Sequence, residues 1–146
     1  MTPAERGLLM LLCPLAEPGA QPLTMGEFLQ LERRFAGTVP AEDCEVTARV
    51  LRSLGLTEAA AERVERLLNR EAALDRYLAA AERRGVQIVT RLDARYPARL
   101  LEKLGDHAPA ALFLRGEAEL LSAPCVSLVG SRDLSEDADA FARRVG

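Results

Sequence analysis

The sequence predicts an α+β chain in which an all-helical module, residues 1–84, precedes the start of an α/β domain, residues 85–146. Two observations predict this division. Up to Gly85, apolar residues recur every three or four positions, as they do on one face of a helix. Beyond Gly85, short apolar runs alternate with turns that contain glycine or proline, which is typical of strands.

The composition narrows the classes of protein that fit. A chain of 146 residues with 49% hydrophobic content can bury one ordinary core, or a small helical module plus part of another domain. The net charge is −3, so any nucleic-acid site would be a local patch. Aromatic residues make up 4% and tryptophan is absent, which argues against a surface built mainly from stacking platforms. Cys13, Cys44 and Cys125 lack the spacing of a zinc site or a disulfide framework, so we expect a reducing cytoplasm, no metal and no cofactor.

The first 37 residues predict two helices. Pro3 suits a first helical turn, and the apolar run at residues 8–13 is too short to span a membrane, so we interpret it as the buried face of the first helix. Residues 17–22 contain two prolines and a glycine and predict a loop. Thr24 can cap a second helix, which we expect to end near Gly37.

A hairpin and a long helix are predicted next. Pro40 marks the entry to a short helix, Gly55 sits where a turn needs a positive φ, and Thr57 can cap the following helix. One apolar stripe then runs to Gly85 and predicts a single long helix, softened midway by Asn69. The turn at Gly55 has two interpretations: a corner of a helical bundle, which we favour because a second turn glycine is missing, or a hairpin that offers its amides to DNA phosphates.

The second half begins with two predicted strands. They cover residues 86–90 and 111–114, and between them residues 93–97 predict a turn that leads into a short helix of Leu100, Leu101 and Leu104. Residues 117–121 predict one or two helical turns. We interpret Tyr96 in this turn as a packing residue rather than a stacking platform, and His107 as a solvated side chain.

A strand-loop-helix unit near the end carries the candidate site. An apolar strand at residues 125–129 runs into Gly130, Ser131 and Arg132, and Ser135 can cap an amphipathic helix. Gly130 lets the backbone approach an anion, the Ser131 hydroxyl and nearby amides can donate to phosphate oxygens, and Arg132 offers a forked guanidinium. A glycine after a strand can also be only a turn. We interpret the arginines at two helix ends as solvated side chains: Arg83, Arg84, Arg143 and Arg144. The carboxylates around the helix start would repel phosphate: Asp133, Glu136, Asp137 and Asp139.

Four segments of the second half occur in a characteristic order: GVQIVT at residues 85–90, DARYPARL at 93–100, LFLRG at 112–116, and VSLVGSR at 126–132 followed by Ser135. Together with their gaps, they resemble the DNA-processing protein family DprA, also called Smf. The resemblance covers residues 85–135. The helical module is similar in kind to the SAM-like or helix-hairpin-helix-like domain that often precedes this core.

The resemblance implies an extended Rossmann-like domain that binds single-stranded DNA, forms a homodimer, and in natural transformation helps to load a RecA-type recombinase. It implies no enzymatic activity. The family's Gly-Ser-Arg turn falls on Gly130, Ser131 and Arg132, with Arg132 expected at a DNA phosphate. Family members often carry an aromatic residue and a glycine shortly after the serine that matches Ser135, whereas this chain is acidic at residues 136–139, which lowers the expected affinity.

The sequence stops at Gly146, inside the helix that such a unit needs before its second parallel strand. We therefore expect a truncated Rossmann-like domain whose dimer surface lies beyond Gly146 and which binds DNA weakly or not detectably by itself. Two other functions fit the residues. A nucleotide hydrolase of the phosphoribohydrolase kind opens with the same unit but needs further glycine loops and a catalytic carboxylate. A protein-interaction module would recruit its partner through an apolar patch on the long helix.

Overall fold

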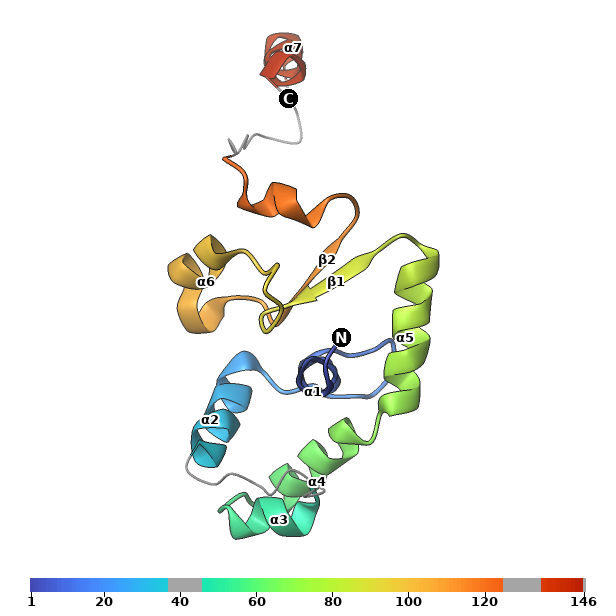
Figure 1. Ribbon diagram of the computed structural model, residues 1–146, viewed down its shortest axis with the longest axis vertical. Helices are drawn as coiled ribbons and strands as arrows, with labels where there is room; N and C mark the ends of the chain where they lie inside the picture. The colour runs from blue at the N-terminus through green and yellow to red at the C-terminus, as the bar shows by residue number, and fades with distance from the viewer. Residues whose placement is uncertain (37–45, 125–134, 146) are drawn as a thin grey trace.

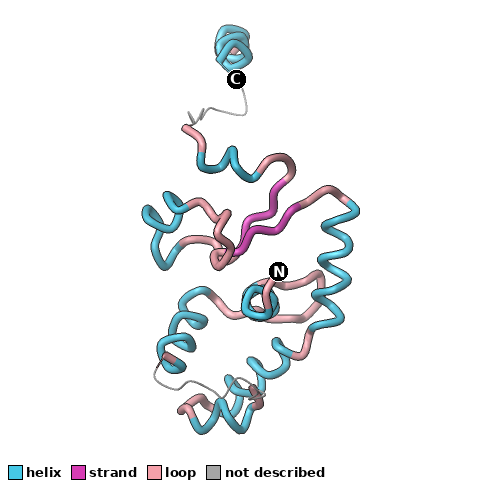
Figure 2. The backbone as a smooth tube through the Cα atoms, viewed as in Figure 1, coloured by secondary structure: helices cyan, strands magenta, loops and turns pink. Residues whose placement is uncertain are grey.

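Helices make up most of the structure and a two-stranded sheet completes it, as the α+β prediction requires (Figure 2). The computed structural model describes residues 1–36, 46–124 and 135–145. Its elements in chain order are α1 (Pro3–Leu12), α2 (Met25–Phe35), α3 (Ala48–Ser53), α4 (Glu58–Leu68), α5 (Glu71–Arg83), β1 (Gln87–Thr90), α6 (Ala98–Leu104), the 3-10 helix η1 (Gly105–His107), β2 (Ala111–Leu114), the 3-10 helix η2 (Ala118–Ser122) and α7 (Glu136–Val145).

Threonine caps start the first four helices. Thr24 and Thr57 cap α2 and α4, as the sequence predicts, and Thr2 and Thr47 do the same for α1 and α3. In α1 and α2 the third helical residue is a glutamate whose carboxylate accepts a hydrogen bond from the backbone N–H of the cap, at 2.6 and 2.7 Å respectively. Each such capping box satisfies donors that a helix start leaves unpaired, so these starts are determined locally.

The predicted long helix is wrong in one respect, because it is divided into α4 and α5. Asn69 and Arg70 leave the helical conformation, with φ/ψ of −81°/23° and −104°/30°. The Arg70 side chain turns inward and donates to backbone carbonyls of α4 and of the α1 terminus, including Leu67 O at 3.3 Å and Cys13 O at 2.9 Å. Contacts between Arg70 and the end of α1, about 57 residues away, therefore interrupt the helix, although the apolar stripe in the sequence continues past this point.

The two strands pair antiparallel, which the sequence did not specify. Gln87 lies opposite Leu114 and Thr90 opposite Ala111. Because side chains alternate across a strand, Ile88 and its partner Phe113 share one face of the sheet, while Val89 and Leu112 share the other.

Both faces of this sheet are covered, and it lies between α5 and α6 (Figure 1). On one face Ile88 and Ala111 pack against a cluster from α1 and α5 that includes Leu9 and Leu74, both fully buried. On the other face Val89 packs with the side chains of α6 and with Tyr96. A third cluster joins α1 to α3 and α4; its buried members are Leu11, Leu23, Leu51, Ala61, Val64 and Leu67.

Polar contacts also connect the helical segment to the sheet. The buried Glu5 carboxylate of α1 accepts a hydrogen bond from the Thr90 hydroxyl of β1 at 3.0 Å. Gly85 follows α5 with a positive φ of 63°, so the chain turns at the predicted boundary. The helical residues and the sheet nevertheless share one apolar cluster. The division into two domains at residue 85 remains a prediction.

The remaining expectations for the second half concern short elements. The strands, the short helix after the turn at residues 93–97 and the helical turns near residues 117–121 are confirmed as β1, β2, α6 and η2. The predicted strand at residues 125–129 lies outside the described residues. In the described ranges, no helix combines the length and the apolar character needed to cross a bilayer.

Candidate nucleic-acid interface

The predicted phosphate-binding residues Gly130, Ser131 and Arg132 lie outside the described residues. The structure describes the elements on either side of them. The segment that precedes them ends with the 3-10 helix η2, and the segment that follows begins at Ser135. The candidate site can therefore be characterised by the helix start at Ser135 and by the charges that surround it.

Ser135 caps α7, as the sequence predicts. Its hydroxyl oxygen accepts a hydrogen bond from the Ala138 N–H at 3.3 Å, and its carbonyl accepts one from the Asp139 N–H at 3.0 Å. A helix start of this kind carries a partial positive charge that favours a nearby anion. Glu136, Asp137 and Asp139 occupy the first turn and already balance that charge. Attraction of phosphate to this place would therefore have to come from the arginine before the helix rather than from the helix itself.

The arginines at the other end of α7 have the solvated positions that the sequence predicts. Arg143 donates from Nε to Asp139 Oδ2 at 2.8 Å, four residues earlier, and its side chain is 78% exposed. Arg144 is exposed as well. Surface pairs of this kind add little stability, and their guanidinium groups remain accessible to solvent.

The turn at residues 93–97 has a structural role. Tyr96 is 5% exposed, and its hydroxyl donates to the Pro109 carbonyl at 2.8 Å, which supports the packing interpretation over the stacking one. The Asp93 carboxylate accepts hydrogen bonds from the backbone and the guanidinium of Arg95, and these bonds lower the pKa of Asp93. Both interactions fix the turn that starts α6 at Pro97.

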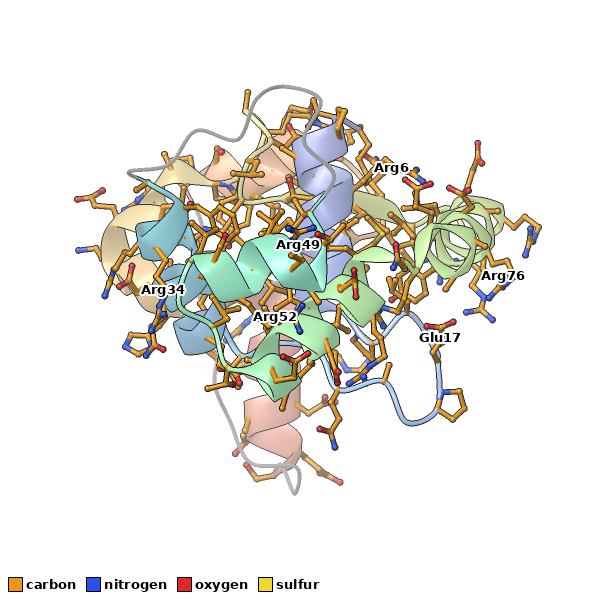
Figure 3. The ribbon with its side chains drawn as sticks, turned by 90° about the horizontal axis from the view of Figure 1, so that it is seen from below. Arg6, Glu17, Arg34, Arg49, Arg52 and Arg76 are labelled. Atoms are coloured by element: carbon orange, nitrogen blue, oxygen red, sulfur yellow. The ribbon has the colours of Figure 1, made fainter. Side chains whose placement is uncertain are left out.

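The hairpin at Gly55 is also explained by structure. Gly55 has the predicted positive φ, 85°. The N–H groups of Leu54, Gly55 and Leu56 all donate to carbonyls of α3, so they are already engaged. Arg34 donates from Nη1 to the Gly55 carbonyl at 2.8 Å, and Figure 3 shows its position on α2. These contacts support a bundle corner rather than a phosphate-binding hairpin.

Cationic side chains of residues 87–124 are spread over four places. Arg91 follows β1, Arg95 lies in the next turn and pairs with Asp93, α6 carries Arg99 and Lys103, and Arg115 follows β2. Because β1 and β2 are antiparallel, Arg91 and Arg115 lie at opposite ends of the sheet. The cations of this described part of the second half are therefore found at both ends of the sheet.

The structure gives no support to reactive chemistry at the other singled-out residues. Cys13 is buried, and desolvation raises the pKa of its thiol, which favours the unreactive protonated form. His107 is exposed in η1. Within residues 1–36, 46–124 and 135–145, no group of three or more histidine, cysteine, aspartate or glutamate residues is placed to hold a metal ion.

Sequence reasoning did not single out Phe113. Its ring is 47% exposed and packs edge-on against the ring of Tyr77, with centroids 6.1 Å apart and an angle of 86° between the planes. The two residues belong to β2 and α5, and the strand pairing brings them together. No pattern within either element predicts this contact, although strand alternation does place Phe113 on the other face of the strand from Leu112 and Leu114.

Residues 87–146 match a family model described as DNA recombination-mediator protein A. The match begins within the first segment that carries the DprA resemblance and includes the other three, Gly130, Ser131 and Arg132 among them, and it confirms that resemblance. Among curated proteins and among solved structures, no match to the chain is found.

Proposed function

Because residues 87–146 match the family model of DNA recombination-mediator protein A, we propose that this chain is part of a DNA-processing protein that binds single-stranded DNA. The observation that carries the proposal is the family match, which spans the Gly-Ser-Arg turn. The resemblance implies no enzymatic activity, so we propose that the protein acts without catalysis.

Phosphate capture in this proposal depends on Arg132. Its guanidinium offers two parallel N–H donors to one phosphate, and the Ser131 hydroxyl and the backbone N–H groups of the turn donate to the remaining oxygens. Ser135, three residues after Arg132, caps α7. The acidic first turn of α7 opposes binding, so affinity is modest and falls as salt rises through counterion release.

The partners follow from the same family. We propose that the full-length protein works in the cytoplasm as a homodimer and delivers single strands to a RecA-type recombinase during DNA uptake or recombination. The helical segment is placed against the sheet by the Glu5–Thr90 hydrogen bond and by the cluster around Leu9 and Leu74.

The test is a binding titration by fluorescence anisotropy with labelled single-stranded and duplex oligonucleotides over a series of salt concentrations. We expect a preference for single strands, and we expect Arg132→Ala to weaken binding of all sequences and to reduce the salt slope by about one unit. Arg144→Ala is the matched control, because it removes an exposed arginine from α7 outside the Gly-Ser-Arg turn. Equal effects of the two substitutions would contradict the assignment of Arg132.

The non-enzymatic part is tested separately. Incubation with nucleoside monophosphates should release neither free base nor sugar phosphate. Release of either product that depends on protein concentration would favour the nucleotide hydrolase instead.

A further inference from the structure

A groove with a volume of about 500 Å³ lies between α5, the loop after α1 and strand β2. Its floor is apolar and is formed on α5 by small side chains, among them Ala73 and Ala80. These two residues are seven positions apart, about two helical turns, so they share one face. The groove has the size of a site for a small organic group.

An aromatic pair closes one side of the groove. Tyr77 comes from α5 and Phe113 from β2, and both line the groove. Phe113 lies directly opposite Ile88 in the sheet, yet its side chain is 47% exposed while Ile88 packs into the core. A half-exposed phenylalanine ring fixed by a second ring offers a planar apolar surface to a ligand.

Two arginines, one in α5 and one at its C-cap, stand at the rim. Arg76 and Arg84 line the groove and are exposed. They are eight residues apart, which is roughly 12 Å along a helix axis. One carboxylate, that of Glu17, also lies there, 3.8 Å from Arg76 and 3.7 Å from Arg70 (Figure 3). Because Arg70 is almost fully buried and stays beside Glu17, it balances this carboxylate and leaves Arg76 able to turn to another anion.

The loop on the opposite side of the groove has an unusual backbone. Leu15 and Ala16 both have positive φ values, 53° and 57°, in a region that residues with a Cβ rarely adopt. Both residues line the groove. Backbone of this kind is found disproportionately at binding sites, where surrounding contacts hold it in place.

We propose that this groove binds single-stranded DNA, with a base stacked on Phe113 and the flanking phosphates held by Arg76 and Arg84. The apolar floor with an exposed ring suits the face of a base, and the two cations suit the backbone that joins successive bases. Charge complementarity favours a polyanion over an apolar peptide. The inference rests on the proposed function and adds a second contact for the strand, outside the Gly-Ser-Arg turn.

The absence of tryptophan from the chain allows a direct test. Phe113→Trp places a single tryptophan in the groove, and stacking of a base on it should quench its fluorescence. The probes are an oligothymidylate and an abasic oligonucleotide with the same number of phosphates. We expect strong quenching by the first and little by the second, because only the first has bases to stack.

Two further variants measure the contribution of the groove to affinity. Phe113→Leu keeps an apolar side chain against Tyr77 but removes the aromatic face, and we expect about 5- to 100-fold weaker binding of oligothymidylate. Arg84→Ala should also weaken binding, whereas Arg83→Ala, which removes the same charge from a residue outside the groove lining, should have a smaller effect. Circular dichroism establishes that each variant is folded.

The outcomes separate the two proposals. If the wild-type chain binds single strands through Arg132 but the Phe113→Trp variant shows no quenching, the groove proposal is wrong and the proposed function stands. If the full-length wild-type protein binds no single strand at the lowest salt, both are wrong. An emission change caused by an acidic amphipathic peptide, or by raising the protein concentration, without any change on adding DNA would identify another occupant and overturn the inference.

Discussion

Arg70 should be one of the residues on which the stability of this fold depends most. It is 9% exposed and lies between α4 and α5. Its guanidinium donates to the carbonyls of Met10, Cys13, Pro14 and Leu67, at 2.9 Å for Cys13 and 3.3 Å for Leu67. Two of these acceptors belong to the end of α1, where a helix leaves carbonyls without partners.

Arg70→Met fills a similar volume but removes every donor. Hydrogen bonds from a charged group are worth about 1.5–3 kcal/mol each, and buried carbonyls left without a donor carry a further cost. Burial of the methionine and the removal of a desolvated charge offset part of this loss. We expect the free energy of unfolding to fall by about 3 kcal/mol, a large fraction of the roughly 5–15 kcal/mol that is ordinary for a domain.

The assay is urea denaturation followed by far-UV circular dichroism. Arg66→Met is the matched control, because Arg66 lies near the end of α4, is 71% exposed and pairs with Glu62 at 3.8 Å. Its effect should stay within about 0.5 kcal/mol. Arg70→Lys should fall between the two, since one ammonium cannot reach carbonyls that lie this far apart. An Arg70→Met variant as stable as Arg66→Met would refute the reasoning.

Three other measurements test the structure. Gly55→Ala should lower the free energy of unfolding by about 1–2 kcal/mol, because φ at Gly55 is 85° and Arg34 is close. Gly26→Ala lies inside α2 with no other atom within contact distance of the new Cβ, so it should be neutral or stabilising by up to about 1 kcal/mol. Equal denaturation midpoints for the two variants would contradict this. Tyr96→Phe should cost about 1 kcal/mol in the same assay through the lost hydrogen bond, and no loss would mean that the bond is not formed. The pKa of Glu5 lies below its ordinary value of 4.5, first because its carboxylate accepts a hydrogen bond from the Thr2 N–H. The ionised Glu5 therefore stabilises the fold above pH 4.5, and this contribution is lost as the pH falls through the lowered pKa. Glu5→Gln should therefore flatten the decline of stability below about pH 4.5, and an unchanged acid transition would show that Glu5 does not contribute to it.

The sequence determined where most elements begin. Thr24, Thr57 and Ser135 cap helices, and Gly55 takes the positive φ of a turn, because each of these signals acts over three or four residues and needs no distant partner. The family match likewise follows from the order of short segments in the sequence. The Gly-Ser-Arg turn at residues 130–132 remains a prediction from the sequence.

The tertiary structure decided what depends on distant residues. The apolar stripe predicted one helix from Thr57 to Gly85, but α4 ends at Leu68, where Arg70 turns inward to donate to carbonyls at the end of α1, about 57 residues away. The pairing of β1 with β2 sets which strand face meets α5, and only that pairing exposes Phe113 beside Tyr77. A local pattern reports the face that a residue shares with its neighbours in sequence, whereas packing between elements determines what that face meets.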